Sequence, residues 1–453
     1  MRSIPLLLPA LLLAAPACGG DDGGGAPVAP ALIAGGGIHD PGIDGTVNVF
    51  VVDADTDLPI AGAAVLVGTV AGTTDAAGLF IATGVTGPQT IVAKAASHAT
   101  AMWVGSDCAN VTMPLDPSPT PLTRPPQAQL TGSITGWAAL PRPDIDSVRV
   151  GLVMFAQDPA LGSKANDLAQ PPPMNNLPAA ACVRTAGANP PCAWKLNARP
   201  GDIALGLVML SIDTRGTGDP NDDATIVTGF AVTPLTVVAG VNQTGVMVDL
   251  PPVSSTVRPT INLGTPPAAL TRVQAVVGLD LGSRGVLRYT MFDPTRAGAV
   301  VPDLAIAAGA HYELLGLASE PIADGTAAQS IVMRRGLTDI TTLSAGSWLP
   351  PPTGLASDRA TVSFTRGQPA GPYVVELVNA GLGVEGRKVM SIAVLDDSSQ
   401  VTLPTAFAPL PADPMTMRVT TLVTDAAIDL RNFEVDALTH GAVAFAADTI
   451  KLP

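Results

Sequence analysis

Hydrophobic side chains recur at every second position in short segments along this chain. Val47, Val49 and Val51 follow this pattern, and so do Ile203 and Leu205. A side-chain period of two is typical of β-strands whose two faces differ. The 46 glycines and 44 prolines are scattered between such segments without forming a low-complexity tract, so they indicate turns. We therefore expect an all-β chain whose short strands stack as β-sandwiches rather than as a parallel sheet.

The composition narrows the classes of protein further. Hydrophobic residues make up 47% of the chain, which is enough to build cores. The chain length of 453 residues suggests about three domains of ordinary size. The first glutamate is Glu313, so most of the chain lacks a residue that surface helices use heavily. The net charge is −14, and the 24 basic residues form no cluster. Nucleic acid requires a basic face, so we exclude it as a partner.

The N-terminal segment has the pattern of an export signal followed by a tether. Arg2 supplies a positive charge, residues 4–15 form an apolar stretch, and small residues lead to Cys18. The apolar stretch is shorter than the roughly 20 residues that a transmembrane helix needs. We therefore predict a signal peptide over residues 1–17 and a flexible Gly-rich tether over residues 18–43.

The end of the predicted signal peptide resembles the lipobox of bacterial lipoprotein precursors, in which the cysteine thiol is acylated and becomes the new N-terminus. Ala17 and Cys18 match that pattern, whereas Ala15 and Pro16 depart from it. The resemblance implies lipidation at Cys18 and an exported protein anchored at the outer membrane or cell surface, with the periplasmic face still open. The alternative is an ordinary signal peptide that is cleaved after Ala17.

Residues 44–116 contain an ordered series of strand and turn motifs. These motifs are Pro59-Ile60, Gly62-Ala63, Val65 with Val67, Thr74-Asp75, Gly78 and Phe80. Their order is similar to that of the carboxypeptidase regulatory-like domain, although Ser97-His98 stands where this family has Gly-Tyr. The resemblance implies a transthyretin-like β-sandwich that serves as an accessory module and carries no catalytic residues. Related sandwiches are often grouped with carbohydrate-binding folds, but a fold alone does not transfer that function.

Proline-rich segments divide the rest of the chain. A linker is predicted over residues 117–127, and Pro350-Pro351-Pro352 ends a later segment. The alternating segments between and after these prolines predict three further β-sandwich domains, either transthyretin-like or immunoglobulin-like. We place these domains at residues 128–252, 253–355 and 356–453.

Three cysteines remain if Cys18 is acylated. Cys182 and Cys192 flank a short loop that is rich in Gly, Asn and Pro, and an exported chain meets oxidising conditions. We predict a disulfide between them, which is worth about 2–3 kcal/mol in the loop-entropy picture. The alternatives are two reduced thiols, or a bond from Cys108 to one of them. Otherwise Cys108 is expected to be a buried small apolar residue.

The motifs for zinc catalysis, nucleophilic hydrolysis and dinucleotide binding are incomplete. The four histidines form no zinc-binding motif, and we expect His311 and Glu313 to be a partly exposed polar pair on one strand face. No Gly-x-Ser-x-Gly motif occurs. Residues 381–386 spell GxGxxG, but a strand-like segment follows where a dinucleotide fold needs a helix, so we expect a hairpin turn.

Two acidic segments raise the question of calcium. Asp53, Asp55 and Asp57 alternate like the first ligands of a calcium loop, but the sharp-turn glycine and the closing glutamate are missing. A second segment offers more oxygen donors, and its candidate ligands are Asp213, Asp219, Asp222 and Asp223. Solvated turns are the commoner explanation for both segments, so we predict no cofactor, with calcium as the alternative.

The tryptophans bear on sugar binding because carbohydrate sites usually stack sugar rings on exposed aromatic side chains. Trp103, Trp137, Trp194 and Trp348 are single and widely spaced, so we expect them in core or edge packing. We therefore predict a non-catalytic, lipid-anchored cell-envelope protein that acts as a structural, adhesive or accessory binding module. Its partners would be the membrane, through the anchor, and a glycan or another envelope protein. The alternatives are a carbohydrate- or peptidoglycan-binding surface protein and a hydrolase with an unrecognised site in residues 128–453.

Overall fold

The computed structural model describes residues 42–54, 58–117, 128–157, 180–188, 191–217, 224–252, 255–292, 299–321, 326–368, 371–379, 387–424 and 442–452. Within these ranges the chain consists of β-strands, turns and three short 3-10 helices, which confirms the predicted all-β class. The 3-10 helices are η1 (Trp137–Ala139), η2 (Gly282–Arg284) and η3 (Leu304–Ile306). No helix in the described ranges is long and apolar enough for a membrane span. The predicted signal peptide and Cys18 lie outside these ranges.

Residues 44–116 fold into two facing groups of strands, one in the order β4-β1-β7 and the other in the order β3-β2-β5-β6. The strands are β1 (Asp44–Asp53), β2 (Ala64–Val67), β3 (Val70–Thr73), β4 (Leu79–Thr86), β5 (Gln89–Lys94), β6 (Thr100–Ser106) and β7 (Asn110–Leu115). Val47, Val49 and Val51 are fully buried on β1 and share one core with Val65 and Ile91 of the facing strands. The hydrophobic alternation therefore decides which face of β1 points inward.

The turn after β3 shows why the Thr74 motif has its residue types. The Thr74 hydroxyl donates to the Ile60 carbonyl at 2.6 Å and accepts from the Ala63 N–H at 2.9 Å. Gly78 closes the turn with φ of 72°, and a Cβ there would lie 2.7 Å from the Val51 carbonyl oxygen. The motif is therefore a structural turn that needs a short hydroxyl side chain and a glycine.

The next region forms a second sandwich from a four-stranded sheet, β10-β9-β12-β13, and a three-stranded sheet, β11-β8-β14. The strands are β8 (Ala128–Ile134), β9 (Ser147–Phe155), β10 (Ala181–Thr185), β11 (Trp194–Ala198), β12 (Gly201–Asp213), β13 (Ala224–Val237) and β14 (Gln243–Val248). Ile203, Leu205 and Leu207 alternate on β12 as the sequence predicts, and all three belong to the core between the two sheets.

The rest of the chain contributes fifteen further strands to the described ranges. The first group is β15 (Thr256–Val257), β16 (Thr260–Asn262), β17 (Arg272–Asp280), β18 (Val286–Phe292), β19 (Val301–Pro302), β20 (His311–Ser319), β21 (Gln329–Leu337) and β22 (Thr342–Ser344). The second group is β23 (Thr353–Ser357), β24 (Thr361–Thr365), β25 (Tyr373–Asn379), β26 (Arg387–Val394), β27 (Gln400–Thr402), β28 (Met415–Thr424) and β29 (Ala442–Leu452). Small sheets, β15-β19, β16-β22 and β23-β24-β27, flank the larger one.

We call residues 44–116, 128–252, 253–355 and 356–453 the first, second, third and last regions. One twelve-stranded sheet contains strands of the first, third and last regions, in the order β18-β17-β20-β21-β29-β28-β25-β26-β6-β5-β2-β3. β29 lies between β28 and β21, where Gln329 opposes Ala447 and Val332 opposes Ala444. β26 pairs in parallel with β6, with Met390 opposite Thr100 and Val394 opposite Val104. The first region is therefore continuous with the last region rather than with the region that follows it in the sequence.

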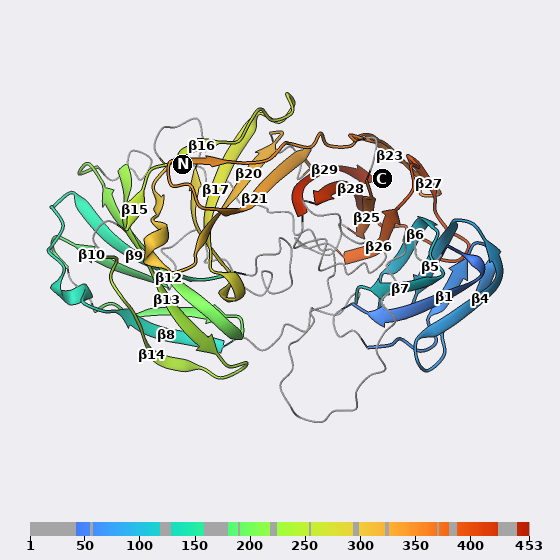
Figure 1. Cartoon of the computed structure of the whole chain (residues 1–453), viewed down its shortest axis with the longest axis horizontal. Coiled ribbons are helices and arrows are strands. Elements are labelled where there is room, and N and C mark those ends of the chain that lie inside the picture. The colour runs from blue at the N-terminus through green and yellow to red at the C-terminus, as the bar shows by residue number, and fades with distance from the viewer. Residues whose placement is uncertain are drawn as a thin grey trace.

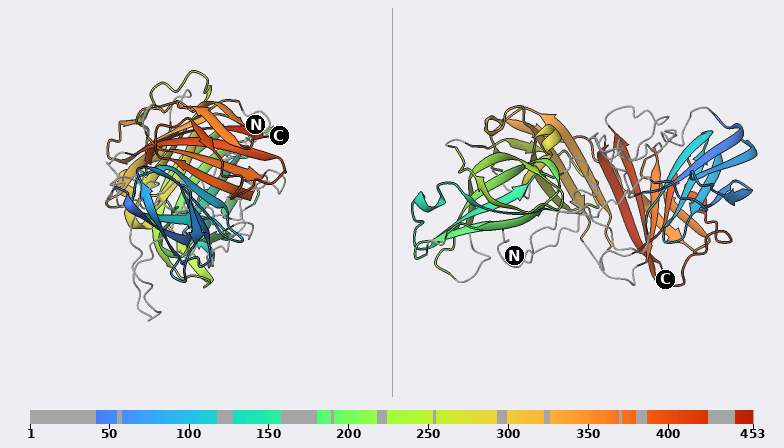
Figure 2. Two further views of the ribbon diagram at one scale, coloured as in Figure 1. Left: turned by 90° about the vertical axis from the view of Figure 1, so that its right-hand side faces the viewer. Right: turned by 90° about the horizontal axis from the view of Figure 1, so that it is seen from below.

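Figure 1 shows the resulting shape as two lobes joined through the sheet. One lobe holds β8 to β22, and the other holds β1 to β7 together with β23 to β28. Both views in Figure 2 show the blue strands of the first region beside the orange and red strands of the last region. The predicted boundaries at residues 116, 252 and 355 remain predictions, while the hydrogen bonding of β29 crosses the last of them.

Candidate functional site

The first candidate site is an ion cluster around the half-buried Lys388, which we call the Lys388 cluster. The Lys388 ammonium on β26 lies 2.8 Å from Oε1 of Glu376 on β25 and 2.9 Å from Oδ2 of Asp116, which follows β7. Arg418 on β28 opposes Glu376 in the register. Because Asp116 comes from the first region and the other three residues from the last region, the cluster ties the two regions together where β6 meets β26.

The electrostatics of this cluster favour the charged form of Lys388. Burial alone lowers the pKa of Lys388, but the Glu376 and Asp116 carboxylates outweigh burial and hold the pKa above its usual value. Burial lowers the pKa of Arg418, and Glu376 partly offsets that shift. A lysine that stays charged and paired at neutral pH is suited to holding two segments together and unsuited to acting as a general base.

The second cluster surrounds Glu313 on β20, which is fully buried. Its carboxylate accepts from Arg288 Nε at 2.8 Å and from Arg335 Nε at 3.2 Å. Arg288 Nη1 also donates to Oε1 of Gln157, a residue of the preceding region, at 3.2 Å. The prediction that His311 and Glu313 form a partly exposed polar pair is therefore wrong for Glu313, because its carboxylate is buried and two guanidinium groups compensate its charge. His311 is exposed.

The calcium candidates do not gather into a site within the described residues. Asp53 instead pairs with His98, whose Nε2 lies 3.0 Å from Oδ2 of Asp53. Asp213 is exposed at the end of β12, and its carboxylate accepts the Arg215 N–H at 2.9 Å. The remaining candidates, Asp55, Asp57, Asp219, Asp222 and Asp223, lie outside the described residues. No group of three or more His, Cys, Asp or Glu side chains that could hold a metal occurs in the described part of the chain.

The predicted disulfide is present between Cys182 and Cys192, whose Cα atoms are 5.0 Å apart. Cys182 lies on β10 and Cys192 precedes β11, so the bond links the two sheets of this sandwich. The backbone N–H of Ile134 on β8 also donates to Cys192 Sγ at 3.2 Å. Cys108 takes no part in the disulfide and is buried, as expected.

The GxGxxG segment at residues 381–386 lies outside the described residues, but the strands on either side of it are described. β25 and β26 pair antiparallel, with Tyr373 opposite Val394 and Asn379 opposite Arg387. The segment that follows the glycines is therefore a strand, as the sequence predicted.

The tryptophans pack as expected. Trp103, Trp137 and Trp194 are buried, and the indole N–H of the half-buried Trp348 donates to the Leu263 carbonyl at 2.6 Å. None of these four side chains offers a fully exposed ring for sugar stacking.

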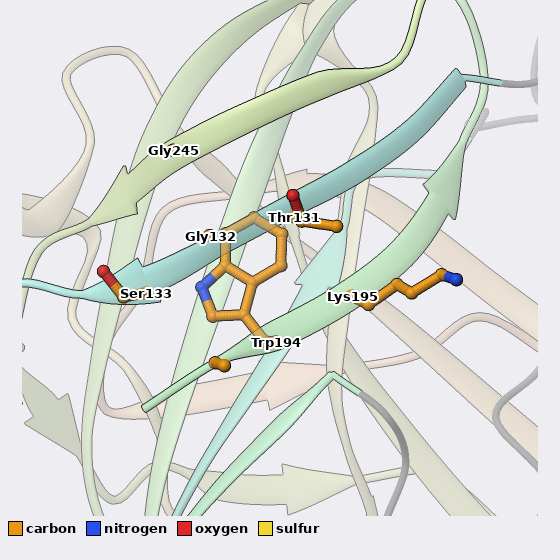
Figure 3. Close-up of a pocket in the computed structure, with 7 residues that line it drawn as sticks. Thr131, Gly132, Ser133, Trp194, Lys195 and Gly245 are labelled. Carbon is orange, nitrogen blue, oxygen red and sulfur yellow. The ribbon is translucent and has the colours of Figure 1, made fainter. Parts of the chain in front are cut away.

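A hollow of about 430 Å³ opens on the three-stranded sheet β11-β8-β14. Its lining includes Thr131, Gly132, Ser133, Trp194, Lys195 and Gly245. Trp194 opposes Gly132 in the register, and a Cβ at Gly132 would lie 2.6 Å from Cζ2 of the indole ring. Figure 3 shows the ring crossing β8 at Gly132, with the Ser133 hydroxyl and the Lys195 ammonium on opposite sides of it. Glycine at position 132 is thus required for the indole to lie against the strand.

Comparisons with known proteins give no family for this chain. No family model matches it, and no curated protein matches it. Among solved structures, it is similar to the FN1–FN3 domains of chicken CNTN1, with 14% identity over 72% of this chain and 98% of that chain, and a TM-score of 0.15. It is also similar to a tetra-tandem repeat in the extending region of a large adhesion protein, with 12% identity over 90% of this chain and 99% of that chain, and a TM-score of 0.12. At these TM-scores the likeness carries no argument about function.

Proposed function

We propose that this chain is a non-catalytic, lipid-anchored protein of the cell envelope whose described strands form a rigid structural or adhesive body. The observation that carries this proposal is the position of the buried charges. The Lys388 cluster links the first region to the last. The cluster around Glu313 links Gln157 to β18 and β20, because Arg288 donates to both Gln157 and Glu313. Buried ion networks fix the relative orientation of the elements that supply them, because separating the elements leaves charges unpaired away from water.

The anchoring part of the proposal rests on the sequence around Cys18. Ala17-Cys18 follows an apolar stretch and precedes a glycine-rich segment. Such a segment would hold a rigid body away from a bilayer while leaving it free to turn. The Cys182–Cys192 bond supports the exported location, because disulfides persist mainly in oxidising compartments.

The anchor is tested with Cys18→Ser in the full-length precursor, expressed in a bacterium that processes lipoproteins. We expect the wild-type protein to enter the detergent phase in a phase-partition experiment, and the variant to stay in the aqueous phase. The matched control is Cys108→Ala, which removes a buried thiol and should partition like the wild type. If Cys18→Ser still enters the detergent phase to the same extent, the anchor proposal is wrong.

A further inference from the structure

We propose that the side chains of Lys388 and Asp116 condense to an amide, with Glu376 as the catalytic residue, so that a covalent bond joins the first region to the last. This inference goes beyond the proposed function, because ion pairs alone are enough for the rigid body proposed above. It does not depend on the anchor at Cys18. If the amide does not form, the ion pairs remain, so the two proposals can fail separately.

The first argument is the position of the reacting atoms. Lys388 Nζ lies 2.9 Å from Oδ2 of Asp116 and 2.8 Å from Oε1 of Glu376. The nitrogen therefore lies between one carboxylate that can become the amide and a second that can carry protons. Amide formation needs a nucleophile, an acyl group and an acid–base group within hydrogen-bond reach of one another, and the cluster supplies all three.

The second argument is that the backbone holds these groups in place. β6 and β26 pair in parallel, with Met390 opposite Thr100. The Asp116 carbonyl accepts the N–H of Ala99, just before β6, at 2.7 Å. The same strand ladder thus positions both Lys388 and Asp116. Groups fixed in this way react as if at an effective concentration of up to about 10⁵–10⁸ M, which favours the amide over a separate amine and acid.

The step balances from the ion pair alone, with the charged form of Lys388 as the starting state. One ammonium proton passes to Glu376 and on to Asp116, which leaves a neutral amine and a neutral carboxyl group. Lys388 Nζ then attacks Cγ of Asp116, and the N–C bond forms. Glu376 carries a second proton from the nitrogen to the Asp116 hydroxyl, whose C–O bond breaks to release water. The nitrogen has lost two protons, the carboxyl group one oxygen, and Glu376 has returned to its first form.

The third argument is the charge that remains after the bond has formed. Lys388 and Arg418 supply two positive charges to the cluster, and Asp116 and Glu376 supply two negative ones. The amide removes one charge of each sign. Arg418 lies opposite Glu376 on β28 and interacts with its charge, so these two still compensate each other. The product therefore leaves no unpaired charge at a site where the Lys388 side chain is 12% exposed and that of Glu376 is 9% exposed.

The test is tryptic peptide mapping, by mass spectrometry, of the full-length mature protein after incubation in the folded state. Trypsin cuts after Arg387 and, in the unmodified chain, after Lys388. We expect the peptide that contains Asp116 to be joined to the peptide that begins at Lys388, with their summed mass lower by one water molecule. Recovery of the two peptides only as separate species would overturn the proposal. A bond from Lys388 to Glu376 instead would overturn the assignment of Asp116.

Variants separate the catalytic residue from the bonded pair. Asp116→Ala and Lys388→Arg should give no linked peptide. Glu376→Gln keeps both bonded side chains but removes the proton carrier, so the linked fraction should rise at least about tenfold more slowly after synthesis. Glu320→Gln, at a glutamate that follows β20, is the matched control and should link at the wild-type rate. With all variants folded by circular dichroism, linking by Glu376→Gln at the wild-type rate would overturn the catalytic role of Glu376.

Discussion

The partly buried carboxylate of Asp448 lowers the stability of the folded protein when it is ionised. It lies on β29 opposite Val419, in the interior of the twelve-stranded sheet. Burial raises its pKa, the Thr449 N–H that donates to it at 2.7 Å opposes this shift, and the nearby Glu320 carboxylate adds to it. A carboxyl group whose pKa is raised by folding stabilises the folded state below its unfolded pKa. That contribution is lost as the pH rises through the folded pKa.

We therefore expect Asp448→Asn to raise the midpoint of thermal unfolding at neutral pH, where the wild-type carboxylate is ionised. The gain should shrink as the pH falls, because the wild-type side chain then takes up a proton and becomes neutral as well. Thermal unfolding followed by circular dichroism over a series of pH values checks this. Asp397→Asn, at an exposed position, is the control. A gain that grew as the pH fell would contradict the assigned direction of the pKa shift.

The sequence pattern predicts the surroundings of the two buried glutamates poorly. Glu313 and Glu376 each occupy a strand in which most neighbours are apolar and buried. Alternation predicts which residues of a strand share a face, but it does not say that a charged residue on that strand is compensated inside the protein. The available signal was an acid within an apolar run, with arginines or lysines on other predicted strands, such as Arg288 and Lys388. Recognising the pairs required knowing which strands are neighbours.

At the scale of elements, the Cys182–Cys192 bond could be predicted because its evidence is local. The two cysteines are ten positions apart, and the loop between them contains turn residues. Individual strands such as β1 and β12 were predictable for the same reason, since their alternation is contained in one short segment. Pairings such as β6 with β26 were not, because no local pattern links residue 100 to residue 390.

We expect the double substitution Cys182→Ala with Cys192→Ala to lower the free energy of unfolding of this sandwich by about 2–3 kcal/mol, because the closed loop constrains the unfolded chain. Urea unfolding followed by tryptophan fluorescence measures this, since Trp194 is buried and is two residues from Cys192 in the sequence. A reductant should shift the wild-type transition and leave that of the double variant unchanged. Cys108→Ala serves as the control for loss of a buried thiol. If the reductant shifted both proteins equally, the bond would not be the source of the stability.

At the scale of the whole molecule, the lobe built from the first and last regions depends on a contact between distant parts of the chain. The parallel pairing of β6 with β26 supplies the backbone hydrogen bonds, and Lys388 supplies the charge that Asp116 and Glu376 require. Breaking a buried ion pair by removing one member typically costs about 3–5 kcal/mol, because the remaining charge stays buried.

We expect Lys388→Met to loosen the junction between these regions while leaving the core of each intact. Hydrogen exchange measured by mass spectrometry should become faster in β6 and β26, and stay close to wild type in the hairpin of β12 and β13, which belongs to the other lobe. Lys451→Met, at an exposed position on β29, is the control. Unchanged exchange in β6 and β26 would show that the cluster does not hold the junction.

The place of β29 in the sheet has a consequence for the order in which the molecule can be assembled. This strand is the last in the described chain, yet it is a central strand, with β28 on one side and β21 on the other. A chain that emerges from its N-terminus onward exposes both neighbouring edges until residues 442–452 arrive. Open strand edges recruit other strands, so this interval is when the newly made chain is most prone to aggregate. A chaperone that covers open strand edges would be most useful to this protein during that interval.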